Sequence, residues 1–141
     1  MSDTRQFTAR IDTAVLERLA RRASRTGMNR SRLAERYIDE GIRMENHPGI
    51  VFRDGVTGRR AALAGGPDVW QLIGAIRDQE ARGDRAVQAV ADLADLTVEQ
   101  VRTAIRYYAD HSGEIDVRIR QNQEIADESE ERWRREQHVI A

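Results

Sequence analysis

The stretch that decides the fold is Gln6-Phe7-Thr8-Ala9-Arg10-Ile11, in which polar and apolar residues alternate strictly. Successive side chains of a strand point to opposite faces. The apolar face would carry Phe7, Ala9 and Ile11. The polar face would carry Gln6, Thr8 and Arg10. The sequence therefore predicts a strand with one buried, apolar face and one solvent-exposed, polar face.

Two short helices are predicted after this strand. Asp12 or Thr13 offers an N-cap for the first helix, and apolar residues recur at helical spacing after it. This helix is expected to end near Gly27, because glycine readily adopts the left-handed conformation that terminates helices. Asn29 caps the second helix. The apolar stripe of that helix consists of Leu33, Ala34, Tyr37, Ile38, Gly41 and Ile42. One strand and two helices bury little surface, and a lone strand leaves its backbone unpaired, so we expect residues 1–45 to form an obligate homodimer.

The rest of the chain reads as a second small domain and a helical tail. After a linker at 45–49, two apolar runs at 50–53 and 59–63 flank a glycine-containing loop at 54–58, which predicts a β-hairpin. Asp68 caps a helix, and two further helices are expected at 85–93 and 97–109, the second with a capping box formed by Thr97 and Gln100. A last helix runs from 114 to about 137. Leu93 belongs to the apolar stripe of the 85–93 helix, whereas Ala126 and Trp133 lie on a broken stripe of the last helix. Trp70 is interpreted as a core anchor.

The expected fold is thus mainly α, with three parts. Residues 1–45 would dimerise, residues 46–112 would form a hairpin with a helix-turn-helix-like domain, and residues 113–141 would form a long C-terminal helix. The 97–109 helix exposes Glu99, Gln100, Arg102, Thr103 and Arg106. The pair of helices at 85–109 is open to two interpretations, a second DNA contact or packing against its neighbours. The near-neutral charge of this region favours packing, because its attraction to phosphates would be weak.

Charge is distributed unevenly along the 141 residues. All 23 basic residues are arginine; ten of them lie in residues 1–45 against seven acids, whereas residues 110–141 carry five arginines and nine acids. A basic N-terminal part and an acidic C-terminal part suggest two different partners. The alternative is a solvated surface on which the charge varies along the chain without a functional reason. No apolar run approaches the roughly 20 residues of a membrane span, and the N-terminus is polar, so we expect a cytoplasmic protein that does not enter membranes.

Catalytic and metal sites are not expected. There is no cysteine, and His47, His111 and His138 have no ligand-like spacing, so each is interpreted as a surface or capping residue. No glycine-rich loop has the residues that cradle a phosphate. We therefore predict no catalytic residue, no metal and no cofactor.

The features that indicate a function lie in residues 1–45, which we call the head. A ribbon of two paired strands fits the major groove of double-stranded DNA, where glutamine reads adenine, arginine reads guanine and threonine reads either. The predicted base-contacting residues are Gln6, Thr8 and Arg10. The predicted phosphate-contacting residues are Asn29, Arg30 and Ser31, at the start of the second helix. The alternative is that these residues are only the polar face of an ordinary edge strand, since any such face has a similar composition.

Two resemblances to known families strengthen this reading. Residues 5–43 resemble the ribbon-helix-helix fold of the Arc, MetJ and CopG repressors, through Arg5 to Ile11, Leu16 and Leu19, the Gly27-to-Ser31 turn and the Leu33-to-Ile38 stripe. Residues 47–120 resemble the small second domain of VapB-type antitoxins. The segments that carry this likeness are 47–50, 58–60, 65–70, 96–108 and 114–119. The resemblances imply a ribbon that reads bases through its polar face, and an antitoxin that represses its own operon and masks a PIN-like ribonuclease toxin.

The function predicted from sequence is therefore a homodimeric transcriptional repressor, the antitoxin of a type II toxin–antitoxin pair, associated with the nucleoid when bound to DNA. Its tail would contact the toxin. The residues proposed for that contact are Arg132, Trp133, Arg134 and Arg135, the alternative being a solvated helix. A stand-alone regulator or DNA architectural protein with a C-terminal assembly domain is the other hypothesis. The operator, the partner and any assembly beyond the dimer stay open.

Overall fold

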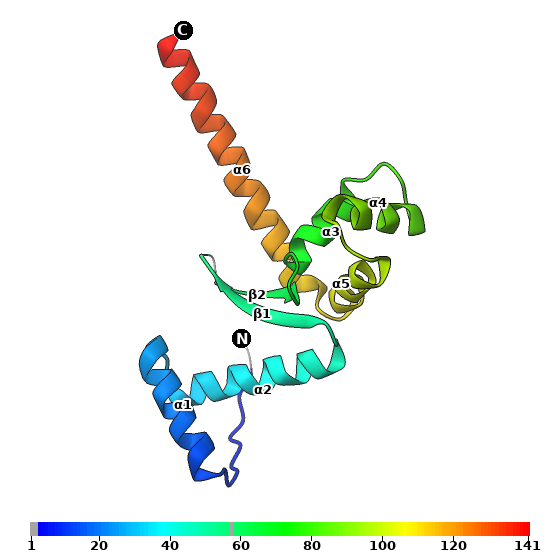
Figure 1. Cartoon of the computed structure of the whole chain (residues 1–141). Coiled ribbons are helices and arrows are strands. Elements are labelled where there is room, and N and C mark those ends of the chain that lie inside the picture. The colour runs from blue at the N-terminus through cyan, green and yellow to red at the C-terminus, as the bar shows by residue number, and fades with distance from the viewer. Residues whose placement is uncertain (1–2, 57) are drawn as a thin grey trace. The chain divides into compact units, whose positions relative to one another are not determined.

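The computed structural model describes residues 3–56 and 58–141 (Figure 1). These residues form six helices and one two-stranded antiparallel sheet, which confirms the prediction of a mainly α protein with a hairpin. The chain divides into two compact units, Met1–Ile42 and Arg43–Ala141.

The first unit holds α1 (Thr13–Thr26) and most of α2 (Arg30–Asn46). The Asp12 carboxylate accepts a hydrogen bond from the Ala14 N–H at 2.8 Å, so the predicted N-cap is confirmed. Gly27 has φ +68°, and the next N–H, of Met28, donates to the Ala23 carbonyl at 3.1 Å, which closes the helix as predicted.

Residues 3–11 form neither helix nor strand in the single chain. A strand requires ladder hydrogen bonds to a neighbour, and the neighbour expected here belongs to a second copy. The intermolecular ribbon therefore stays a prediction. The linker expected at 45–49 is shorter than predicted, because α2 continues through Asn46.

The second unit begins with the hairpin of β1 (Ile50–Gly55) and β2 (Gly58–Leu63), in which Ile50 faces Leu63 and Gly55 faces Gly58. The loop predicted at 54–58 is therefore too long. An ion pair between Asp54 and Arg59 at 3.3 Å extends the ladder into that stretch. Position 57 lies outside the described residues.

Four helices follow: α3 (Val69–Arg77), α4 (Asp84–Ala94), α5 (Val98–Asp110) and α6 (Ser112–Ile140). The capping box of α5 is confirmed, since the Gln100 N–H donates to Thr97 Oγ1 at 3.1 Å and the Thr97 N–H donates to Gln100 Oε1 at 2.9 Å. Helix α6 begins two residues before and ends three residues after the predicted 114–137.

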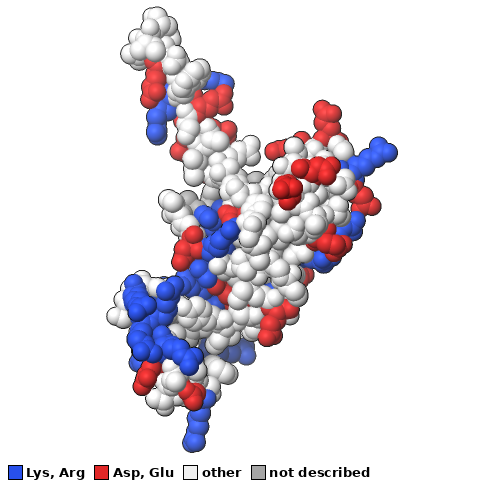
Figure 2. All heavy atoms as spheres, in the orientation of Figure 1, with Lys and Arg blue, Asp and Glu red and all other residues white. Residues whose placement is uncertain are grey.

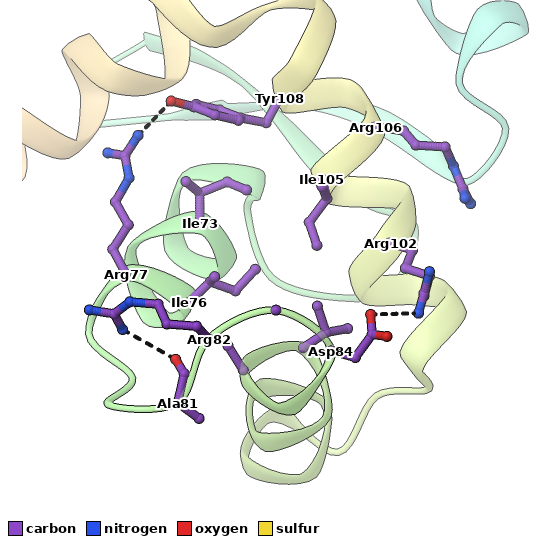
Figure 3. A pocket seen from close by; sticks show the side chains of 13 residues that line it. Ile73, Ile76, Arg77, Ala81, Arg82, Asp84, Arg102, Ile105, Arg106 and Tyr108 are labelled. Carbon is purple, nitrogen blue, oxygen red and sulfur yellow. Dashed lines mark hydrogen bonds and ion pairs between the residues drawn. The ribbon is translucent and has the colours of Figure 1, made fainter.

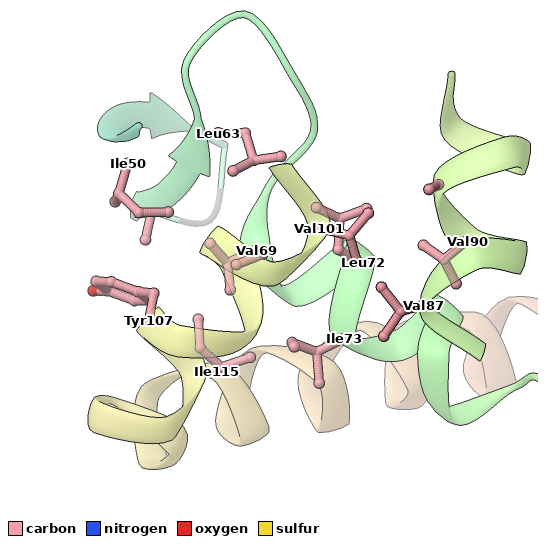
Figure 4. Close-up of a cluster of buried hydrophobic side chains, with 13 residues drawn as sticks. Ile50, Leu63, Val69, Leu72, Ile73, Val87, Val90, Val101, Tyr107 and Ile115 are labelled. Atoms are coloured by element: carbon pink, nitrogen blue, oxygen red, sulfur yellow. The ribbon is translucent and has the colours of Figure 1, made fainter. Parts of the chain in front are cut away.

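The hydrophobic core of the second unit lies between the hairpin, α3, α4, α5 and the first turn of α6 (Figure 4). Its buried members are Ile50, Ala61, Leu63, Val69, Leu72, Ile73, Val87, Val90, Ala91, Val101, Ala104, Tyr107 and Ile115. Three residues of the predicted apolar stripes are exposed: Leu93, Ala126 and Trp133. Leu93 lies about 90° from the centre of the buried face of α4, where Ala94 takes its place. Trp70 is only half-buried.

Asp68 joins the hairpin to α3. Its carboxylate is buried and lies 3.1 Å from Arg53 Nη2 and 2.6 Å from Arg60 Nε, both on the hairpin. The Trp70 indole N–H also donates to it, at 3.1 Å. This explains the position of Trp70, whose ring stays near the surface because its N–H is bound to the cap of its own helix.

Two adjacent tyrosines fix the start of α6 to α5. The Tyr107 hydroxyl bonds to Glu114 and accepts from Arg43 at 2.8 Å, while the Tyr108 hydroxyl donates to Asp116 at 2.9 Å. Burial, together with the Glu114 carboxylate, raises the pKa of Tyr107 above its usual range. The beginning of α6 is thus held by core packing and by carboxylate–tyrosine bonds.

His47 does not lie on the surface as predicted. Only 8% of its side chain is exposed, its Nε2 lies 2.9 Å from an Asp110 carboxylate oxygen, and its ring meets Tyr107 edge-on at 5.2 Å. The residue looked like part of a linker because its burial depends on α5, which comes about 60 residues later in the sequence. His111 does terminate a helix, as predicted, and His138 is exposed.

Candidate nucleic-acid interface

A basic stripe follows one side of α1. Arg18, Arg21, Arg22 and Arg25 are all exposed, and their spacing places them within about 100° of the helix circumference. Figure 2 shows arginine side chains gathered where Figure 1 places α1. Sequence reasoning noted the arginine-rich head but did not assign these four, although their i, i+3, i+4, i+7 spacing was already readable.

The first unit also presents an apolar face that its own described residues do not cover. Among its described residues only Ala23, Leu33 and Glu40 are buried. The large apolar side chains that stay exposed are Phe7, Ile11, Val15, Leu16, Tyr37, Ile38 and Ile42. Several of them line a groove of about 480 Å³ between α1 and α2, with Arg18 and Arg22 among its lining residues. Exposed apolar faces of this kind are typical of surfaces that bind another protein.

The predicted base-contacting residues Gln6, Thr8 and Arg10 are exposed and lie in the irregular segment before α1. Two apolar residues of the same segment, Phe7 and Ile11, are exposed as well. The segment therefore presents both its polar and its apolar side chains to solvent in the single chain.

The start of α2 has the geometry of a capped helix. Asn29 Oδ1 accepts from the Ser31 N–H at 2.8 Å and from the Arg32 N–H at 3.4 Å. Because this oxygen is used by the helix, Asn29 acts as an N-cap, and a phosphate at this end would rely on the side chains of Arg30 and Ser31 and on the helix dipole. Both side chains are exposed.

The arginines of α5 are paired within the second unit. Arg102 Nη2 lies 3.2 Å from the Asp84 carboxylate, and Arg106 Nη2 lies 3.5 Å from Glu99. Both arginines flank a groove of about 690 Å³ that runs between α3, α4 and α5 over Ile73, Ile76, Val87 and Ile105 (Figure 3). These pairs leave α5 less suited than α1 to attract phosphates.

The tail residues Arg132, Trp133, Arg134 and Arg135 are all exposed on α6. Arg134 lies within ion-pair distance of Glu130, one turn before it. Residues 121–140 are exposed throughout, although Asn122, Gln123 and Ala126 line a groove with α3.

Within the described ranges 3–56 and 58–141, no group of three or more histidine or acidic side chains is placed to hold a metal ion. Nor does any helix in this part of the chain have the length and apolar character needed to cross a bilayer. The chain matches no known family model, and comparison with characterised proteins and with solved structures finds no relative.

Proposed function

We propose that the chain is a homodimeric, sequence-specific DNA-binding repressor whose first unit is a ribbon-helix-helix domain. The observation that carries this proposal is the uncovered apolar face of residues 3–42, which lies beside the basic stripe of α1. A second copy would bury that face and would pair the two segments 6–11 into a ribbon.

In this dimer the apolar side chains Phe7 and Ile11 would turn inward against both copies of α1 and α2. Alternation then points Gln6, Thr8 and Arg10 of both strands outward, where they would read base edges in one major groove. The N-termini of α2, with Arg30 and Ser31, would hold flanking phosphates and set the register.

We further propose that the second unit serves a protein partner, a PIN-like ribonuclease toxin, so that the chain acts as an antitoxin that represses its own operon. Support comes from the distal part of α6, a long exposed helix on which Trp133 stands among Arg132, Arg134 and Arg135. Arginine forks suit the carboxylates that surround a metal-dependent nuclease site.

The DNA-binding proposal is tested by fluorescence anisotropy on the DNA upstream of the gene and on a scrambled copy of it. Arg10→Ala should weaken specific binding by about 1–3 kcal/mol per lost base contact and leave binding to scrambled DNA nearly unchanged. Arg85→Ala, which removes an exposed arginine of α4, is the matched control for charge. An unchanged preference between the two DNAs would refute the assignment of Arg10.

The antitoxin proposal is tested by expressing the adjacent reading frame alone and together with this chain. Growth arrest that this chain relieves, with the two products eluting together, supports an antitoxin. Absence of both toxicity and co-elution would refute the toxin partner and leave a stand-alone dimeric regulator.

A further inference from the structure

The groove of about 690 Å³ between α3, α4 and α5 has an apolar floor and lies within the size range of small-molecule sites. Ile73 and Ile76 of α3 face Ile105 of α5 across it (Figure 3). Val87 of α4 also lines the floor. Ile73 and Val87 belong to the buried core, and Ile76 and Ile105 pack against it. The shape of the floor is therefore fixed by core packing.

The rim of this groove is basic. The residues that line it include the four arginines Arg77, Arg82, Arg102 and Arg106, whereas Asp84 is the one acid among them. Three of these arginines lie within 3.5 Å of a carboxylate: Arg77 of Asp116, Arg102 of Asp84 and Arg106 of Glu99. These three pairs are neutral, so the excess positive charge of the rim comes from Arg82.

Arg82 binds the main chain instead of a carboxylate. Its Nη1 donates to the carbonyls of Gln79, Glu80 and Ala81, at 2.5, 3.3 and 3.2 Å. Asp78, an acid of the same loop, lines a different groove between α3 and α6. In the described part of the chain these carbonyls are the partners of Arg82, which leaves Nε and Nη2 for another group. This edge of a guanidinium is a fork that binds a carboxylate through two hydrogen bonds.

The loop that carries Arg82 is attached to a helix at each end. The Asp78 N–H donates to the Gly74 carbonyl of α3 at 3.1 Å, and the Ala86 N–H of α4 donates to the Gly83 carbonyl at 3.0 Å. Gly83 has φ +63°, a conformation that glycine adopts without strain. Because both ends of the loop are held, little conformational entropy is lost when a ligand binds beside it.

We propose that this groove binds an organic anion that has an apolar body and one carboxylate. The carboxylate is held by Arg82, and the body covers Ile73, Ile76 and Ile105. Sugars and other molecules that need many hydrogen bonds do not fit an aliphatic floor, because their polar groups would lose water without gaining partners. The site goes beyond the proposed repressor function and lies wholly in the second unit. It uses none of the residues proposed for DNA or for the toxin.

Methyl NMR of the full chain, with the isoleucine δ1-methyl groups labelled, tests this proposal. The probe is 2-naphthoate, and an average free energy per ligand atom predicts a dissociation constant of about 1 mM or below. The methyl signals of Ile73, Ile76 and Ile105 should shift along one saturable curve. Ile38 and Ile42, on the exposed face of the head, report non-specific binding and should not follow this curve.

A neutral probe tests the requirement for charge. 2-Naphthylmethanol has the same rings as 2-naphthoate but no carboxylate, so the cation on the rim does not attract it. It should bind at least about threefold more weakly, as the loss of a partly exposed ion pair predicts.

Two variants test the role of Arg82. Arg82→Gln should weaken 2-naphthoate binding about three- to tenfold and leave 2-naphthylmethanol binding unchanged. Arg85→Gln is the matched control, because Arg85 is an exposed arginine three residues away that does not line the groove. It should change the affinity for 2-naphthoate less than about twofold.

Four outcomes would overturn the proposal. They are saturable shifts confined to Ile38 and Ile42, no saturable shift at the three floor methyl groups, equal affinities for the two probes, and equal effects of Arg82→Gln and Arg85→Gln. None of these outcomes bears on DNA binding, which is measured separately through Arg10→Ala.

Discussion

Truncating Ile38 should weaken the head dimer by a calculable amount. Ile38 lies on α2 in the uncovered apolar face, and 54% of its surface is exposed in the single chain. Complete burial of an isoleucine side chain is worth about 2–3 kcal/mol, so covering the exposed half contributes about 1–1.5 kcal/mol. A two-fold interface contains the residue twice, which gives about 2–3 kcal/mol per dimer. Ile38→Ala should therefore raise the dimer dissociation constant about 30- to 150-fold.

Sedimentation equilibrium over a range of protein concentrations measures this constant. Leu93→Ala is the matched control, because Leu93 is an exposed large apolar residue of the second unit, 77% exposed, and lies outside the head. The control should keep the dissociation constant of the unsubstituted protein within about twofold.

The reasoning would be refuted if Ile38→Ala and Leu93→Ala changed the dissociation constant equally. It would also be refuted if the parent protein sedimented as a monomer at concentrations at which it binds specific DNA, because a ribbon cannot form within one copy. DNA affinity measured on the same samples should fall together with the dimer fraction.

Three further predictions concern charged and hydrogen-bonded groups. Arg30→Ala should weaken binding to all DNA sequences alike and make the salt slope shallower by about 1.8 in a dimer, whereas Arg85→Ala should leave the slope unchanged in anisotropy titrations. Burial raises the pKa of Tyr107 above its value in the unfolded chain, so the unfolded chain releases the phenol proton at a lower pH than the folded chain does. The free energy of unfolding should therefore fall as the pH rises above about 10. Tyr107→Phe should make that decline shallower, as measured by chemical denaturation. Asp68→Asn leaves two hairpin arginines without their carboxylate and should cost about 2–3 kcal/mol of unfolding free energy, against less than about 1 kcal/mol for the exposed Asp54→Asn.

Local signals in the sequence were sufficient for most of the helices. The caps at Asp12, Asn29 and Thr97 and the stop at Gly27 were predicted correctly, because each depends on hydrogen bonds between residues at most five positions apart. The hairpin was found from its two apolar runs and the glycine-containing loop between them. Its strands extend further than predicted, since a cross-strand ion pair at the loop cannot be inferred from this pattern.

The sequence by itself determined the helical character of the chain, the order of its elements and the candidate DNA-contacting residues, since helical period, strand alternation and capping chemistry act over a few residues. Only the tertiary structure decided which side chains are buried. It placed His47 beneath α5, joined Asp68 to two strands, left Leu93 and Trp133 in solvent and showed that the head does not cover its own apolar face. Burial depends on segments far apart in the sequence, and no local pattern specifies which of them meet.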